Sequence, residues 1–162
     1  MKIFLVGYMG AGKTYYGMQL ARKGHVFYDL DKLIEKRCGG KSVKEVFNLF
    51  GEEYFRKLET LELKRLAAVE GDYVLATGGG TPCHSDNMIL MNEVGHTIFL
   101  DTDVNLIVKR LTTDKSDRPL IANMDDDELT DFVTKQRKER LPFYQMAKET
   151  LEMNANNEYL IL

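Results

Sequence analysis

The sequence predicts an α/β protein of three layers, α/β/α, with helices on both faces of a parallel sheet. Two observations lead to this expectation. Short, continuous apolar runs alternate with longer segments of helical spacing, and glycines or aspartates follow several of these runs. Strands that are apolar throughout are typical of parallel sheets buried on both faces. A chain of 162 residues fits a single domain that buries a substantial core.

Strands are expected where three or four apolar residues follow one another. The segment "KIFLV" at 2–6 is the clearest example, because it is apolar after its first residue and ends at a glycine. The last segment, "ETLEM", is more polar and is expected at an edge of the sheet. The predicted strands are 2–6, 25–29, 73–77, 96–101 and 149–153.

Helices are expected where apolar residues recur every three or four positions. One face of the segment 52–70 carries Phe55, Leu58, Leu66 and Val69, with Leu61 at its edge. The segment 127–140 is expected to stop near Pro142, because proline interrupts helical hydrogen bonding. The polar stretch 112–127 is expected to be a loop or a lid. The predicted helices are about 13–22, 32–37, 42–50, 52–70, 85–94, 104–111 and 127–140.

Composition excludes several classes of function. A net charge of −3 gives no overall basic character that would attract nucleic acid. No apolar run approaches the roughly 20 residues that span a bilayer, and the first run is too short for a signal-peptide core. Cys38 and Cys83 belong to no C-x-x-C spacing, so a structural zinc site is not expected. We therefore expect a cytoplasmic protein that binds neither nucleic acid nor a membrane.

A phosphate-binding loop is the most specific motif. "GYMGAGKT" at 7–14 fits G-x-x-x-x-G-K-[ST] and lies between a predicted strand and a predicted helix. In such a loop backbone N–H groups surround phosphate oxygens, aided by the helix dipole. Lys13 would contact the β- and γ-phosphates and Thr14 would bind Mg²⁺. The alternative, a glycine-rich turn with a chance Lys-Thr pair, is disfavoured by the complete motif and its context.

Two aspartates follow the second predicted strand. Asp29 and Asp31 are two residues apart, and in an extended chain this spacing directs both carboxylates to one side. One carboxylate would support Mg²⁺ through water, and the other would accept a hydrogen bond from a substrate hydroxyl. The alternative is that Asp31 only caps the helix 32–37.

Three glycines follow the third predicted strand, in "ATGGG". Gly78, Gly79 and Gly80 lack Cβ atoms, so a small ligand can lie against their backbone and take hydrogen bonds from it. This arrangement suits a small polyol better than a macromolecule. The alternative is a tight turn without a ligand.

Three arginines come from distant segments: Arg56, Arg118 and Arg140. An arginine binds a carboxylate or a phosphate through two parallel N–H···O bonds, which a lysine cannot reproduce. Each arginine taken alone is better explained as a solvated surface charge or as part of an ion pair at the rim of a site.

Together these motifs resemble the shikimate kinase family along the whole chain. The resemblance implies a five-stranded parallel sheet of the nucleoside-monophosphate-kinase type with a mobile lid. It also implies transfer of the γ-phosphate of ATP to the 3-hydroxyl of shikimate, towards chorismate and the aromatic amino acids, by a monomer that uses Mg²⁺. Six segments carry the resemblance, in the order of the family: "GYMGAGKT", "DLDKLIE", "GEEYFRKLE", "ATGGG", "DRPL" and "RLPFYQMA".

The resemblance, carried over by position, gives each candidate residue a task. Residues 30–60 would form a substrate-binding subdomain and residues 112–127 the lid. The expected catalytic residues are Asp31, Lys13 and Arg118, and the expected Mg²⁺ site is Thr14 with Asp29 (through water). The expected ATP contacts are Gly10, Ala11, Gly12, Lys13, Thr14, Tyr15, Arg110 and Arg118. The expected substrate contacts are Asp31, Arg56, Gly78, Gly79, Gly80 and Arg140, with Phe55 packing nearby and Glu59 orienting Arg56.

The chain departs from the family pattern in three places. Tyr15 stands where the family usually has a small hydroxyl residue, and the segment 21–31 is a residue or two shorter than usual. After an adenine-side loop, expected within 152–162, the family has a longer final helix.

The expected mechanism depends on positioning and charge neutralisation. Lys13, Mg²⁺ and Arg118 would offset the charge of the transferring group, and lid closure would exclude water. An aspartate with the ordinary pKa of about 3.9 is a weak base for an alcohol. Asp31 is therefore expected to orient the hydroxyl and to accept its proton late.

Two alternative functions remain open at this point: a kinase of another small hydroxy acid such as gluconate, and a non-catalytic nucleotide-binding regulator. The combination of D-x-D, FR-x-x-E and GGG favours shikimate over gluconate. Retention of Lys13, Asp31 and Arg118 favours catalysis.

Overall fold

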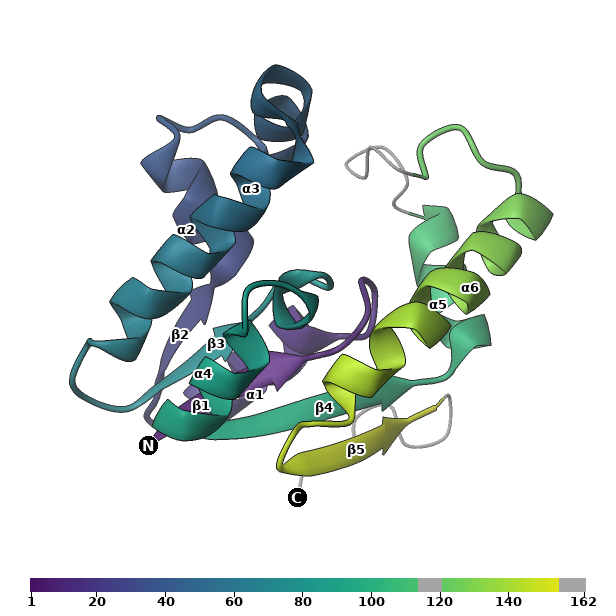
Figure 1. The fold of residues 1–162 in the computed structure, drawn as a ribbon. Coiled ribbons are helices and arrows are strands. Elements are labelled where there is room, and N and C mark those ends of the chain that lie inside the picture. The colour runs from purple at the N-terminus through teal and green to yellow at the C-terminus, as the bar shows by residue number, and fades with distance from the viewer. Residues whose placement is uncertain (114–120, 155–162) are drawn as a thin grey trace.

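A computed structural model of the chain describes residues 1–113 and 121–154. Within them, five strands form one parallel sheet with the order β2-β3-β1-β4-β5 (Figure 1). The predicted α/β class and the parallel sheet are confirmed, and every predicted strand is present to within one residue at each end. The strands are β1 (Lys2–Val6), β2 (Val26–Asp29), β3 (Tyr73–Ala76), β4 (His96–Thr102) and β5 (Glu149–Met153).

Helices fill the connections between the strands. Two of them begin with a reciprocal capping box, in which Ser42 pairs with Glu45 and Asp125 pairs with Glu128. The elements are α1 (Lys13–Ala21), α2 (Leu30–Arg37), α3 (Val43–Ala67), α4 (Asn87–Val94), α5 (Val104–Thr113) and α6 (Asp126–Tyr144), with a 3-10 turn η1 (Thr81–Cys83).

The central strand β1 divides the core between the two faces of the sheet, because its side chains alternate. Phe4 and Val6 pack with buried residues of α2 to α6 in the larger cluster. Ile3 and Leu5 pack with Tyr16 of α1 in the smaller cluster on the other face. The layers are therefore α/β/α, as predicted. Figure 1 shows α2 with α3, and α5 with α6, as two arms on either side of the loops that follow β1 and β3.

Helix α3 consists of two helical segments that meet at Gly51. This residue has φ 83° and ψ 170°, a conformation that glycine adopts without steric cost. The break confirms the predicted division into 42–50 and 52–70. Three of the four apolar residues predicted for the inner face are buried. The prediction for Val69 was wrong, because α3 ends at Ala67 and Val69 is exposed.

Helix α6 ends at Tyr144, near Pro142 as predicted, although it includes the proline and runs four residues beyond the predicted segment 127–140. A proline here removes only one backbone donor near the end of the helix, and the next turn closes through the N–H of Gln145, which donates to Leu141 O across 2.9 Å. The side chain of Tyr144 is completely buried. Burial of this ring adds to the stability of the last turn.

The predicted lid, 112–127, overlaps regular structure at both ends. Residues 112–113 belong to α5 and residues 126–127 to α6. Residues 114–120, with Arg118, and residues 155–162 lie outside the described part of the chain. Across 1–113 and 121–154, the structure contains no helix with the length and apolar character to cross a bilayer.

Candidate active site

The phosphate loop follows β1, as the motif predicted. Gly7 has φ 147° and Gly12, which caps α1, has φ 98°; both positions require glycine. Lys13 is buried, and its Nζ donates to the carbonyl oxygens of Gly7 (2.7 Å) and Tyr8 (2.8 Å). The ammonium group is thus fixed against the loop, at the start of α1, where the helix dipole favours an anion.

A cavity of about 410 Å³ opens beside this loop, which is in the size range of small-molecule sites. It lies at the carboxyl end of the sheet, where the strand order 2-3-1-4-5 changes direction at β1, the usual ligand position in open α/β sheets. The predicted site residues that line it are Gly10, Ala11, Gly12, Lys13, Thr14, Tyr15, Asp29, Asp31, Gly78, Gly79 and Arg110.

Two of the predicted nucleotide contacts lie at the outer side of this cavity. Arg110, in the last turn of α5, donates from Nη1 to Gly10 O across 2.8 Å. The same nitrogen lies 3.3 Å from the position that a Cβ on Gly12 would occupy. Tyr15, in the first turn of α1, is half exposed. Arg110 thus supports the phosphate loop from the α5–α6 arm.

Thr14 and Asp29 form a pair of oxygen donors. Thr14 Oγ1 donates to Asp29 Oδ2 across 3.1 Å, and Asp29 Oδ1 accepts from the N–H of Lys32 across 3.3 Å. Asp29, rather than Asp31, therefore caps α2, and the suggestion that Asp31 is only a helix cap was wrong. Hydroxyl and carboxylate oxygens suit Mg²⁺, which takes few protein ligands and completes its shell with phosphate oxygens and water.

Asp31 does not lie on a strand, as the extended-chain argument assumed, but in the first turn of α2. It still lines the same cavity as Asp29. Its Oδ1 is buried and has no hydrogen-bond partner within residues 1–113 and 121–154. Burial, and then the negative charges of Asp29 and Glu59, raise the pKa of Asp31 to about 6, against the opposing effect of Lys13. The expectation of an ordinary pKa was wrong.

Gly78, Gly79 and Gly80, which we call the glycine platform, support three charged side chains. Their φ values are not in the left-handed region, so space, and not backbone conformation, requires glycine. A Cβ on Gly78 would stand 2.7 Å from Glu59 Oε1. On Gly79 it would stand 3.3 Å from Arg140 Nη1, and on Gly80 2.6 Å from both terminal nitrogens of Arg56. Arg56 and Arg140, which lie far apart in the sequence, therefore both contact one short loop.

Glu59 links the platform to the second half of α3. Its side chain is buried, and its carboxylate accepts hydrogen bonds from Arg56 Nη1 (2.8 Å) and Thr81 Oγ1 (2.6 Å). Glu52 accepts from the other side of the guanidinium, 3.3 Å from Nη2. Burial alone would lower the pKa of Arg56, but the two carboxylates raise it above its ordinary value. Arg56 therefore stays charged in a half-buried position.

Arg140, on α6, approaches the platform from the opposite arm. Its guanidinium carbon lies 5.7 Å from the ring centre of Tyr8, a distance typical of a cation–π contact. One turn further along, Tyr144 donates from its hydroxyl to Gly79 O across 2.6 Å. The platform is thereby held from the side of α6 as well as from the side of α3.

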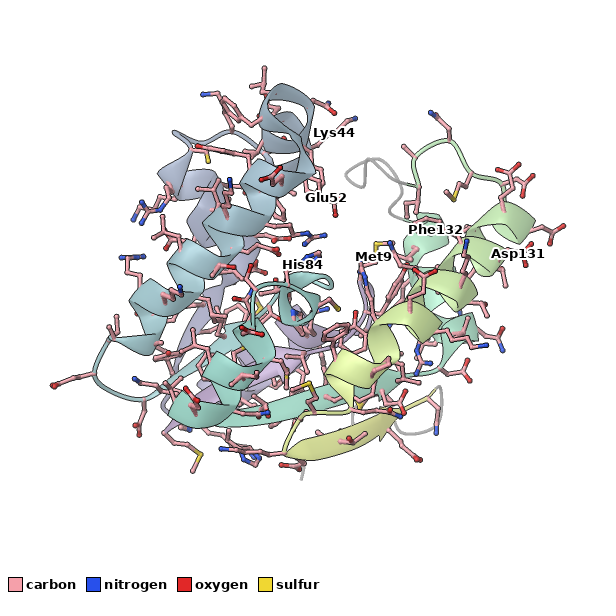
Figure 2. All side chains as sticks on the ribbon, viewed as in Figure 1. Met9, Lys44, Glu52, His84, Asp131 and Phe132 are labelled. Carbon is pink, nitrogen blue, oxygen red and sulfur yellow. The ribbon has the colours of Figure 1, made fainter. Side chains whose placement is uncertain are left out.

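Glu52 and His84 lie at the inner side of the two arms, with Met9 of the phosphate loop nearby (Figure 2). Burial and the positive charge of Arg56 lower the pKa of His84, so its imidazole is neutral at pH 7. No sequence motif predicted a role for any of these three residues.

One predicted residue, Phe55, stands apart from the cavity. Its ring is buried, and the centre of the ring lies 4.7 Å from that of Phe47, which is also on α3. This packing within α3 is expected of a supporting residue.

Some residues of the site were not predicted. Thr81 directly follows the motif "ATGGG", and Tyr144 lies within the motif "RLPFYQMA". A polar side chain next to a glycine run was the available signal for Thr81. Further cavity residues that were not predicted are Met9, Tyr16, Thr77 and Met153.

A phosphate loop at the switch point of a 2-3-1-4-5 parallel sheet defines a P-loop nucleotide-binding protein with the fold of the nucleoside monophosphate kinases. Comparison with known proteins gives the family. The profile described as "Shikimate kinase" matches residues 9–159, and the chain belongs to this family.

Individual relatives agree with the profile. Shikimate kinases of Phocaeicola vulgatus and Bacteroides fragilis are each 48% identical over 148 residues; the matches cover 91% of this chain and 83% and 82% of the relatives. A crystal structure of shikimate kinase from Bacteroides thetaiotaomicron has a TM-score of 0.88 at 44% identity, covering 94% of this chain and 86% of that one. Shikimate kinase from Acinetobacter baumannii in complex with shikimate has a TM-score of 0.84 at 36% identity, covering 94% and 83%.

Proposed function

We propose that this protein transfers the γ-phosphate of ATP to the 3-hydroxyl of shikimate, giving shikimate 3-phosphate and ADP in the synthesis of chorismate and the aromatic amino acids. The observation that carries the proposal is the glycine platform. It holds two arginines and the buried Glu59 beside a phosphate loop, and Asp31 lines the same cavity as that loop; this combination suits an acceptor with both a carboxylate and hydroxyl groups.

The nucleotide would bind along the phosphate loop. The N–H groups of Gly10 to Gly12 and the ammonium of Lys13 would surround the phosphates, and Arg110 would hold the loop from α5. Thr14, supported by Asp29, would bind Mg²⁺. The metal supplies charge neutralisation between the β- and γ-phosphates.

The acceptor would lie on the glycine platform. Arg56 and Arg140 lie against adjacent glycines, so their guanidinium groups would bind one carboxylate from two sides. The backbone of Gly79 and Gly80 would then contact a ring hydroxyl. The carboxylate of Glu59 keeps Arg56 in this position while no substrate is bound.

Asp31 would orient the attacking hydroxyl and accept its proton. Its Oδ1 is buried beside the cavity, and a pKa of about 6 makes it a better base than an ordinary aspartate. The proton is transferred after the bond between the γ-phosphate and ADP has loosened, because the transition state of phosphoryl transfer is loose.

We also propose that residues 30–60 form the substrate-binding subdomain, that residues 112–127 act as a lid with Arg118 at the transferring phosphoryl group, and that the enzyme is monomeric. The last point, the monomeric state, is the expectation from the family resemblance. Light scattering of the purified protein would check it, and a dimer would contradict it.

ADP release tests the function. We would measure it with ATP and Mg²⁺ in the presence of shikimate, of gluconate, or of neither. We expect release that requires shikimate. Release with gluconate alone would overturn the assignment of the acceptor but not that of the phosphate loop. Binding of ATP without release in any mixture would support a non-catalytic regulator.

A further inference from the structure

Thr81 is a buried hydroxyl residue outside the proposed catalytic set. It begins η1, directly after the glycine platform, and is 0% exposed. Its Oγ1 donates to Glu59 Oε1 across 2.6 Å, while Arg56 Nη1 donates to Glu59 Oε2 across 2.8 Å. One carboxylate is therefore held between a hydroxyl on the loop and a guanidinium on α3.

The carboxylate of Glu59 is closely enclosed on the side of Thr81. A Cβ on Gly78 would stand 2.7 Å from Glu59 Oε1 and 2.9 Å from Thr81 Oγ1. The hydrogen bond between them thus passes directly by the bare Gly78 backbone. A buried carboxylate oxygen that loses its donor is costly, and the side chain responds by rotating or by recruiting another cation.

The backbone of Thr81 is itself fixed. Asn87, 1% exposed in the first turn of α4, donates from Nδ2 to Thr81 O across 2.9 Å. The N–H of Thr81 donates to Gly78 O across 3.3 Å. Both contacts define the direction of the hydroxyl, so α4 contributes to the placement of a residue on α3.

We infer that Thr81 is a positioning residue for the substrate carboxylate, acting through Glu59 on Arg56. The inference rests on the proposed function, in which Arg56 binds that carboxylate. Without the hydroxyl, Glu59 turns towards Arg56, and the guanidinium moves off Gly80. Binding of the acceptor then weakens, while the phosphate loop is untouched.

The test compares Thr81→Val, which removes the hydroxyl and keeps the branched shape, with Thr81→Ser, which keeps the hydroxyl. Shikimate-dependent ADP release gives KM and kcat. We expect Thr81→Val to raise KM for shikimate roughly tenfold and to change KM for ATP and kcat less than about twofold. Thr81→Ser should stay within about threefold of the wild type in KM for shikimate.

A second comparison distinguishes a positioning role of Thr81 from a packing role. In an Arg56→Met background, Thr81→Val should add no further change in KM for shikimate, because its effect passes through Arg56. Thermal unfolding is followed for every variant, and Thr81→Ala replaces Thr81→Val if the latter fails to fold.

Three results would overturn the inference while the proposed function stands: an unchanged KM in Thr81→Val, an equal rise in Thr81→Val and Thr81→Ser, or an additive effect in the Arg56→Met background. Wild-type protein without shikimate-dependent ADP release would overturn the proposed function and this inference together.

Discussion

The guanidinium of Arg56 rests directly on Gly80, with both terminal nitrogens 2.6 Å from the place where a Cβ would stand. The contact is possible only because the residue beneath has no side chain. It explains in steric terms why a chain accepts the entropic cost of three consecutive glycines.

Gly80→Ala should therefore displace Arg56. The guanidinium is the end of a flexible side chain, so we expect it to move and the fold to persist. KM for shikimate should rise at least about tenfold, as expected for loss of a charge-assisted contact, while KM for ATP changes little. Steady-state kinetics with each substrate varied in turn would measure this, and an equal change in both KM values would contradict it.

Asp31→Asn should remove the base and keep the shape of the site. We expect kcat to fall by about 10² to 10⁴ and the affinity for ATP to remain nearly unchanged. Asp131→Asn is the matched control, because Asp131 is exposed on α6, on the side away from the α2–α3 arm (Figure 2). Single-turnover measurements would check the effect, and full turnover by Asp31→Asn would refute the assignment.

The raised pKa of Asp31 also predicts a pH-dependent stability. The carboxyl group binds its proton more tightly in the folded than in the unfolded protein. Its stabilising contribution is thus present below about pH 4 and is lost as the pH rises through about 6. Asp31→Asn should be more stable than the wild type at pH 7, by at most about 3 kcal/mol. Urea unfolding of both proteins at pH 4.5 and 7.5 would show whether this difference becomes smaller in acid.

Tyr144→Phe should loosen the glycine platform from the α6 side. The variant keeps the buried ring but removes the donor to Gly79 O, at a cost of about 1 kcal/mol in stability. A rise of a few-fold in KM for shikimate should accompany the loss of stability. Tyr54→Phe, at an exposed tyrosine, is the control and should change neither quantity. Denaturant unfolding and shikimate titrations would be read side by side.

The sheet and most helices were predictable because their signals are local. Apolar runs predicted four of the five strands, and Gly51 marked the break in α3. The exact ends of helices were less predictable: α6 continues past Pro142 to the buried Tyr144, and α3 ends two residues before Val69, which is exposed.

The candidate site was predictable in its residues but less so in its geometry. Spacing put Asp29 and Asp31 together for the wrong reason, since Asp31 lies on a helix. The contacts of the platform with Arg56 and Arg140 join segments far apart in sequence, and no local pattern encodes them. Burial, which sets the pKa of Asp31, is likewise a property of the assembled fold.

The strand order fixes the distances between the parts of the site. The phosphate loop and the glycine platform follow β1 and β3, and Asp29 is the last residue of β2. These three strands are consecutive neighbours in the sheet. Their separation is thus set by the spacing of hydrogen-bonded strands, about 4.8 Å, and not by the packing of side chains. Substitutions that weaken the packing of the core leave this spacing unchanged until the strands of the sheet separate. In such variants each molecule should be either folded and active or unfolded and inactive. The total activity should therefore fall in proportion to the folded fraction, and the activity of each folded molecule should not decline gradually.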